Sequence, residues 1–184
     1  MRDPEIRAAL VDQLRRTHRD PIENRIWPEM SVGLGASRVD VGLVNGRISG
    51  YEIKSAHDSL GRLEGQVLHY GRCLDRATIV TAESRAATIA NHVPEWWGVT
   101  IALDRGDCPR LRVARKAAPN PGVEPFYVAQ LLWRDEAYAE LKSRDLHHGL
   151  AKATRWELWD RLAELPLRKL QAAVRVRLKA RPAF

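Results

Sequence analysis

Cysteine is scarce in this sequence, and long hydrophobic runs are absent. Cys73 and Cys108 are the two cysteines among 184 residues, too few for a disulfide-stapled scaffold or a cysteine-rich metal site. No apolar stretch approaches the ~20 residues that a membrane-spanning helix needs. The first residues, MRDPEIRAALVDQLRR, also lack the apolar segment of a signal peptide. We therefore expect a soluble cytoplasmic protein that has no membrane partner.

Acidic residues are scarce near the C-terminus. The formal net charge is +7, and residues 168–181 hold six Lys or Arg and no Asp or Glu. A local basic surface predicts a polyanionic partner, most often nucleic acid. On the predicted helix, Arg168, Arg175 and Lys179 cluster near one another, so we expect them to contact nucleic acid. The alternative, a helix surface that is merely solvated, is equally compatible with the charge alone.

The pattern of apolar residues predicts a single α/β domain. Period-two runs on either side of Asn45-Gly46 indicate a β-hairpin. Helical periodicity precedes and follows this hairpin, and the composition, 45% hydrophobic and 29% charged, is that of a globular protein. The order predicts a mixed β-sheet flanked by helices. The predicted helices lie near 4–16, 60–74 and 84–91, and the strands near 39–43, 48–53, 77–82, 99–103 and 111–114, while residues around Pro21 and Pro28 are expected to form a loop.

The chain divides at a proline-rich segment. Residues 117–125 (AAPNPGVEP) contain three prolines and a glycine, and they predict a linker or long loop between a core at 1–116 and a basic helical extension at 126–184. The extension is expected to form helices near 128–132, 134–142, 155–163 and 167–178. We expect it to pack on the core, because it is small and contains Trp133, Trp156 and Trp159.

The residues with the clearest chemistry are Asp40, Glu52 and Lys54, within RVDVGLVNGRISGYEIKS. Two carboxylates can hold a divalent cation, which stabilises charge on a phosphoryl group, and a neighbouring lysine can offset developing negative charge. A two-residue turn would place Asp40 and Glu52 on opposite faces of the sheet. A three-residue turn, Asn45-Gly46-Arg47, places Asp40 opposite Glu52, and it puts Lys54 on the same face. We predict this second register. A surface ion pair on an edge strand is the alternative for the Glu-Ile-Lys segment.

The D-x11-E-x-K arrangement on a hairpin that lies between helices resembles the PD-(D/E)XK nuclease superfamily, which has the restriction-endonuclease-like fold. The proline of the motif is replaced by Val39. The longer run through Tyr70 is similar to a small prokaryotic and phage group within that superfamily. The resemblance implies a metal-dependent endo- or exodeoxyribonuclease, a hydrolase that uses Mg²⁺ or, in its place, Mn²⁺. It implies that Asp40 and Glu52 ligate the metal and that Lys54 is catalytic.

The same resemblance implies further site residues. An upstream acid completes the metal site, and the two candidates are Glu29, which we favour, and Glu5. Gln66 matches a glutamine that follows the catalytic lysine on a helix. Arg62 and Tyr70 lie four residues to either side of Gln66, so they can line the same side of that helix and contact nucleic acid. The alternatives are core packing for Tyr70 and a surface ion pair for Arg62.

The alternative function is that of a protein with the same fold that binds nucleic acid but hydrolyses it weakly or not at all. The chain would then be a nucleic-acid-binding subunit or adaptor with little or no cleavage activity, in a repair, mobile-element or defence complex. Its partners would be nucleic acid, with DNA favoured, and a second copy of the chain or a larger complex.

Two other features have simpler explanations: His147-His148 is typical of a flexible turn, and Trp96-Trp97 is expected to pack beside a strand rather than to stack on bases.

Overall fold

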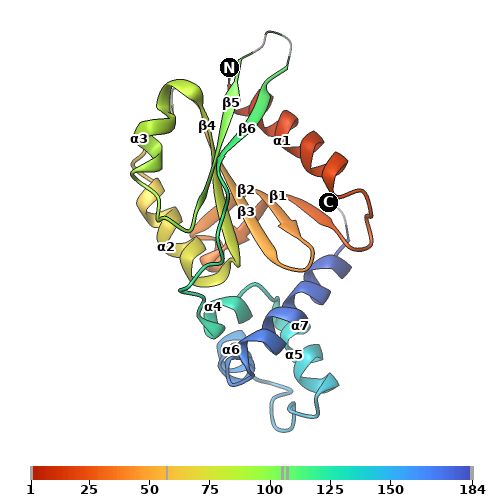
Figure 1. The fold of residues 1–184 in the computed structure, drawn as a ribbon. Coiled ribbons are helices and arrows are strands. Elements are labelled where there is room, and N and C mark those ends of the chain that lie inside the picture. The colour runs from red at the N-terminus through yellow and green to blue at the C-terminus, as the bar shows by residue number, and fades with distance from the viewer. Residues whose placement is uncertain (1, 57, 105, 107, 183–184) are drawn as a thin grey trace.

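The computed structural model describes residues 2–56, 58–104, 106 and 108–182, and a six-stranded mixed sheet lies at its centre (Figure 1). The strand order follows the chain from β1 to β6; β3, β4 and β5 run parallel to one another, and the other neighbouring pairs are antiparallel. The predicted fold class, a mixed sheet flanked by helices with further helices at the C-terminus, is confirmed. The strands are β1 Arg25–Val32, β2 Ser37–Val44, β3 Ile48–Lys54, β4 Arg76–Ala82, β5 Gly98–Leu103 and β6 Arg110–Arg115.

Helices cover both faces of the sheet and one of its ends (Figure 1). Helix α1 packs on one face through Ile6, Leu10 and Leu14, which repeat every four residues. Helices α2 and α3 lie on the opposite face. None of the helices in the described residues has the length and apolar character to cross a membrane. The helices are α1 Asp3–Thr17, α2 Leu63–Cys73, α3 Ala86–Ala90, α4 Pro125–Ala129, α5 Arg134–Ser143, α6 Arg155–Ala163 and α7 Leu167–Ala180, with single 3₁₀ turns at Gly33–Gly35 and Glu83–Arg85.

The C-terminal helices share a hydrophobic core with the α2 side of the sheet. Leu132, Leu158 and Leu170 are fully buried in one cluster with residues from β1 to β5. The segment that joins the two parts is held in place, since the Asn120 side chain donates to the carbonyls of Gly71 and Leu74 at 2.8 and 2.7 Å. Helices α4 to α7 therefore pack against the sheet and do not form a separate domain with its own core.

Strand β1 occupies a region that the sequence predicted as a loop. Pro28 lies within this strand, opposite Val41 of β2. Proline cannot donate to a ladder, so it is confined mostly to edge strands, and β1 is an edge strand. The prediction of a loop was wrong, because proline near a short apolar run disfavours a central strand but permits an edge strand.

The hairpin has the predicted three-residue turn. Val44 lies opposite Ile48, and the Asn45 side chain accepts a hydrogen bond from the Arg47 amide at 3.1 Å. The β2–β3 pairing continues to Val41 and Tyr51. At Asp40 the neighbouring β1–β2 pairing is irregular: Glu29, which would face Asp40, has a left-handed backbone with φ of 51°. Such an irregularity changes the direction in which a side chain points. The Asp40 side chain therefore departs from the regular alternation of side chains between the two faces of the sheet, at the first position of the D-x11-E-x-K arrangement.

Candidate nucleic-acid interface

Four of the predicted site residues form one buried polar network. Lys54 donates to Glu52 Oε1 over 2.8 Å, and both side chains are almost fully buried, with 5% and 3% exposed. Gln66 Nε2 donates to the same oxygen at 2.6 Å, and the Tyr70 hydroxyl donates to Glu52 Oε2 at 2.7 Å. Helix α2 supplies Gln66 and Tyr70 four residues apart, so both side chains reach β3. The network joins α2 to the hairpin.

Burial sets the electrostatics of this network. Burial raises the pKa of Glu52 above its ordinary value, the negative charge of Asp40 raises that pKa further, and the Lys54 charge opposes both effects. Burial also raises the pKa of the Tyr70 hydroxyl, and the neighbouring Glu52 adds to this increase. Tyr70 therefore remains protonated and serves as a hydrogen-bond donor; its hydroxyl lies 2.7 Å from the Arg38 carbonyl as well.

Asp40 binds to different partners, on the α1 side. Arg7 of α1 donates to Asp40 Oδ1 at 2.9 Å and to the Asp40 carbonyl at 2.8 Å, while the Ile53 amide donates to Oδ2 at 2.7 Å. Burial raises the pKa of Asp40, and the hydrogen bonds from Ile53 and Arg7 oppose that shift. The same arginine contacts Asp3, four residues earlier. Sequence reasoning did not identify Arg7; the Asp3–Arg7 spacing on a predicted helix was its only signal.

The predicted metal ligands do not fit a divalent ion in this arrangement. All four carboxylate oxygens of Asp40 and Glu52 accept hydrogen bonds. Glu29 forms an ion pair with Arg38 and is 57% exposed, and Glu5 binds Arg2 at the start of α1. In the part of the chain that the structure describes, no third carboxylate completes a ligand group with Asp40 and Glu52. An ion would have to displace Arg7 or Lys54.

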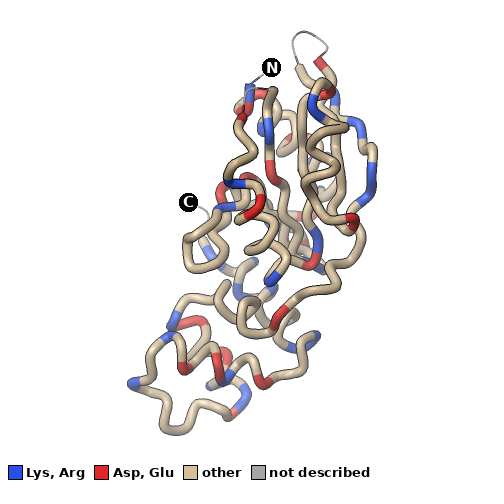
Figure 2. Tube along the Cα trace, turned by 90° about the vertical axis from the view of Figure 1, so that its left-hand side faces the viewer, with Lys and Arg blue, Asp and Glu red and all other residues tan. Residues whose placement is uncertain are grey.

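The basic residues of α7 are mostly engaged within the chain. Arg175 lies 3.9 Å from Asp75, and Lys179 lies 3.2 Å from Glu23. Arg177 and Arg181 pair with acids of α5. Figure 2 shows Lys and Arg interspersed with Asp and Glu in the C-terminal helical part. Two of the predicted nucleic-acid contacts, Arg175 and Lys179, therefore form ion pairs that attach α7 to its neighbours. Arg168 is exposed, and so is Arg62, which precedes the first residue of α2.

A groove that the sequence did not predict lies between β1 and the C-terminal helices. It has a volume of about 960 Å³, and its walls come from the end of α1, from β1, from the segment between α4 and α5, and from helices α5 to α7. Glu29 is the one acidic residue in its lining, and that residue is already paired with Arg38. The basic side chains that line the groove are six arginines and one histidine: Arg15, His18, Arg19, Arg25, Arg134, Arg155 and Arg181.

Four of these arginines retain an unneutralised charge. Within the described residues, Arg15, Arg19, Arg25 and Arg155 form no ion pair with a carboxylate. Arg15, Arg19 and Arg155 are exposed, and Arg25 is half-buried. A concave surface lined by charges of one sign concentrates its field, so the groove attracts anions more strongly than the same charges dispersed over the surface.

Aromatic rings lie beside these charges. The Arg25 guanidinium lies 5.2 Å from the ring centroid of Trp27, and that of Arg181 lies 4.2 Å from the ring centroid of Trp133. Trp133 is 52% exposed at the groove, so part of its ring can contact a ligand. By contrast, Trp97 is fully buried and stacks on Tyr70, which agrees with the packing role predicted for it.

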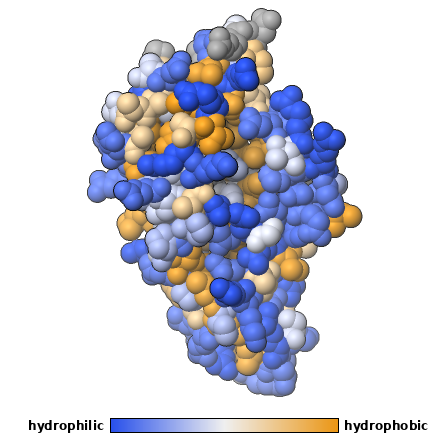
Figure 3. All heavy atoms as spheres, in the orientation of Figure 1, coloured by the Kyte–Doolittle hydropathy of each residue, from blue (hydrophilic) through white to orange (hydrophobic). Residues whose placement is uncertain are grey.

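The face of the molecule that Figure 1 presents is mostly polar. Figure 3 shows mostly hydrophilic residues on the face seen in Figure 1, with hydrophobic residues in small groups between them. The groove was not predicted from the sequence, because its arginines come from two segments that are more than 100 residues apart. One local signal was the pair Arg25 and Trp27, a cation and an aromatic ring two residues apart, which lie on strand β1.

Fold and site together define a mixed α/β protein that has an arginine-lined groove and a buried Glu–Lys pair. The chain belongs to the family described as bacteriophage P4 protein cII, whose model matches residues 1–182. Protein cII of Enterobacteria phage P4 is 26% identical over 136 residues, which cover 74% of this chain and 51% of that relative. The chain thus spans about half the length of the curated relative it matches. No solved structure matches the chain.

This membership corrects the nuclease assignment. The matched family is that of protein cII and not a PD-(D/E)XK nuclease family, so the assignment to that superfamily and the predicted phosphodiester hydrolysis were wrong. The physical reason is that the D-x11-E-x-K spacing requires only a hairpin register and a buried ion pair. Here Lys54 donates to Glu52, and Glu52 also accepts hydrogen bonds from Gln66 and Tyr70 of α2.

Proposed function

We propose that this protein binds nucleic acid without cleaving it, as a binding subunit or adaptor, and that the arginine-lined groove holds the nucleic acid. DNA is the substrate we favour. The proposal includes the cytoplasmic location that the sequence predicts, since a nucleic acid partner is available there. The single observation that carries it is the set of four arginines in one concave surface that form no ion pair within the described residues, beside an exposed tryptophan.

The chemistry of the groove suits a phosphate backbone. Nucleic-acid affinity comes largely from Lys and Arg that neutralise phosphates and release counterions. Arg25 lies on β1 and Arg155 at the start of α6, so two separate elements of the lining each offer a cation to a bound strand. Trp133 adds a partly open ring, and aromatic rings stack on bases of any sequence. This combination predicts binding that depends strongly on salt and weakly on sequence.

The buried network supports the non-cleaving part of the proposal. A hydrolytic site needs a metal or a free base beside the scissile phosphate. Here Lys54 is committed to Glu52, both are buried, and Asp40 is committed to Arg7 and to the Ile53 amide. These groups stabilise the hairpin, so we expect the bound strand to remain intact.

Binding can be tested by fluorescence anisotropy with labelled DNA at several salt concentrations. The groove variant is Arg25→Gln with Arg155→Gln. The control, Arg168→Gln with Lys169→Gln, removes the same charge from exposed positions on α7 outside the groove. We expect the groove variant to bind at least about tenfold more weakly in low salt and to reduce the salt slope by about two units, because two phosphate contacts are lost.

The control variant separates the groove from overall charge. It should bind nearly as well as the wild type, and both variants should keep the wild-type melting temperature. Equal losses in the two variants would show that net charge rather than the groove drives binding. No binding by the wild type to single-stranded or duplex DNA or RNA in low salt would refute the proposal, and shortening of the DNA in the presence of Mg²⁺ would refute its non-cleaving part.

A further inference from the structure

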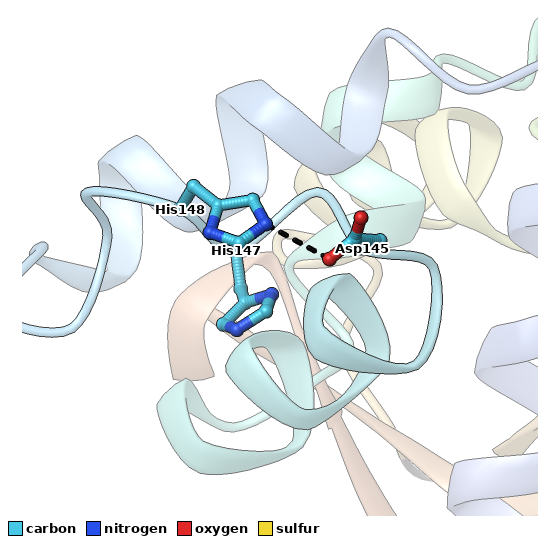
Figure 4. A group of neighbouring side chains, drawn as sticks. All are labelled: Asp145, His147 and His148. Atoms are coloured by element: carbon cyan, nitrogen blue, oxygen red, sulfur yellow. Dashed lines mark hydrogen bonds and ion pairs between the residues drawn. The ribbon is translucent and has the colours of Figure 1, made fainter.

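A separate group of metal-ligating side chains lies in the loop between α5 and α6, at the lower end of the molecule in Figure 1. Asp145, His147 and His148 each offer a ligand atom, and these atoms all lie within 4.8 Å of one another. Figure 4 shows the three side chains gathered on one turn of the loop. His148 Nε2 is hydrogen-bonded to Asp145 Oδ1 at 2.9 Å, and the two imidazole rings have centroids 4.6 Å apart. From this grouping we propose a binding site for a divalent transition-metal ion, with Zn²⁺ as its best occupant.

The loop backbone is fixed where the ligands attach. Asp145 adopts a left-handed conformation with φ of 59°, and its amide donates to the Lys142 carbonyl at the end of α5. The Leu146 amide donates to the Leu141 carbonyl, which turns the chain away from the helix axis. These bonds hold the three ligand residues in one turn. Only the side chains need to move when a metal binds.

The loop is anchored beyond the ligands as well. The Leu150 amide donates to the His147 carbonyl. Arg134, at the start of α5, donates to the carbonyls of Ala151 and Ala153 at 2.9 and 3.2 Å, so the returning part of the loop is tied to the same helix. A loop that is ordered before binding loses less conformational freedom when the ion arrives.

His147 provides an independent indication of a ligand. Its Nδ1 is buried and has no hydrogen-bond partner, although its ring packs edge-on against Tyr138. A buried polar atom without a partner is costly in a folded protein and calls for an explanation. A metal ion bound to Nδ1 would supply the missing partner. The orientation of the His147 ring is already fixed by its packing against Tyr138.

The ligand set selects the class of metal. Two imidazoles and one carboxylate suit Zn²⁺, Ni²⁺ or Cu²⁺, whereas Mg²⁺ and Ca²⁺ prefer oxygen ligands. Ligand atoms around a tetrahedral Zn²⁺ lie roughly 3.4 Å apart, given bonds of about 2.0–2.2 Å. Asp145 and His148 are highly exposed, with side chains 84% and 75% accessible, so they can rotate inward to close this difference.

Electrostatics at the end of α5 also favour a cation. The site follows the C-terminal end of this helix, which carries the negative end of the helix dipole. Three protein ligands leave a fourth coordination position open for water or for a donor from a partner. The structure thus assigns to this loop an open metal site of the His₂Asp type, far in sequence from the residues that the sequence predicted to hold Mg²⁺.

Isothermal titration calorimetry with Zn²⁺ tests this site directly, and Co²⁺ absorption reports tetrahedral coordination. The ligand variants are His147→Phe, which keeps a ring against Tyr138, His148→Ala, and Asp145→Asn, since asparagine tolerates the left-handed backbone. We expect one Zn²⁺ per chain, and we expect each variant to weaken binding at least about tenfold, the range typical of losses at metal sites. His92→Ala is the control, because His92 is exposed in the turn after α3 and its side chain is hydrogen-bonded to the Thr88 carbonyl of that helix.

The control should bind Zn²⁺ like the wild type, and all of these proteins should keep the wild-type circular dichroism spectrum. The proposal is overturned if wild type binds no Zn²⁺ at micromolar concentrations. It is equally overturned if binding persists in His147→Phe and His148→Ala, or if His92→Ala loses as much affinity as they do.

Discussion

The Arg181 guanidinium, next to the end of α7, lies over the Trp133 indole at the start of α5, 4.2 Å from its ring centroid. The same group pairs with Glu136 and donates to the Leu131 carbonyl at 2.7 Å. One side chain therefore joins a cation–π contact, an ion pair and a backbone hydrogen bond. Arg181 also lines the groove. A residue that was predicted to belong to a free basic segment therefore holds the end of α7 against α5.

Replacing Arg181 should destabilise the protein. Arg181→Ala removes the partner of Glu136, whose side chain is only 17% exposed, and uncovers Trp133. We expect the free energy of unfolding, measured by urea denaturation, to fall by about 1–3 kcal/mol. Arg168→Ala, at an exposed position of the same helix, should change it by no more than about 0.5 kcal/mol. Equal effects would mean that Arg181 is ordinary surface.

The Glu52–Lys54 pair should show strong coupling. Lys54→Met alone leaves Glu52 buried without its cation, and Glu52→Gln alone leaves Lys54 buried without its anion. Each single variant should lose about 3–5 kcal/mol of stability. The double variant should lose less than the sum of the two, with a coupling of about 1–3 kcal/mol in a double-mutant cycle followed by chemical denaturation. Additive losses would contradict a direct interaction.

The stability contributed by Glu52 should decline as the pH rises. Burial raises the pKa of folded Glu52 above its ordinary value of 4.5, so the folded protein binds this proton more tightly than the unfolded chain does. The contribution is fully present below the unfolded pKa, and it is lost as the pH rises through the folded pKa. Unfolding of wild type and Glu52→Gln from pH 4 to pH 8 should therefore show a wild-type advantage that is largest in acid. An advantage that grows with pH would reverse the assignment.

Manganese should not distinguish wild type from Asp40→Asn. Asp40 and Glu52 are saturated by hydrogen bonds from Arg7, Lys54, Gln66, Tyr70 and a backbone amide. An ion that binds only the folded state raises its melting temperature, but none is expected to bind between these carboxylates. Differential scanning fluorimetry should give the same Mn²⁺-induced shift in both proteins. A rise in wild type that disappears in Asp40→Asn would show that the arginine and lysine give way to a metal.

Local patterns were sufficient for most of the fold. The alternation on either side of Asn45-Gly46, together with the choice of a three-residue turn, predicted the register in which Val44 faces Ile48. Four-residue spacing predicted the buried side of α1, and the spacing of Gln66 and Tyr70 predicted that α2 reaches Glu52. These features depend on residues close in sequence or joined by a tight turn, where periodicity carries the information.

Features that depend on distant segments were not predictable in the same way. Arg7 reaches Asp40 across 33 positions, and Lys179 reaches Glu23 across 156. No periodic pattern encodes such pairs, so the basic residues of α7 suggested a binding surface when most of them neutralise acids elsewhere. The family assignment failed for a related reason: a short spacing of two acids and a lysine is shared by catalytic sites and by structural ion pairs.

The groove joins a strand near the start of the chain to a helix near residue 180, and this has a consequence for synthesis on the ribosome. Its first wall, with Arg25 and Trp27, emerges early, but the opposite wall is incomplete until Arg181 has left the exit tunnel and α7 has docked. Contacts of such long range form late in folding. A nascent chain therefore has no assembled groove, and its capacity to hold a ligand arises only after the residues through Arg181 have been synthesised.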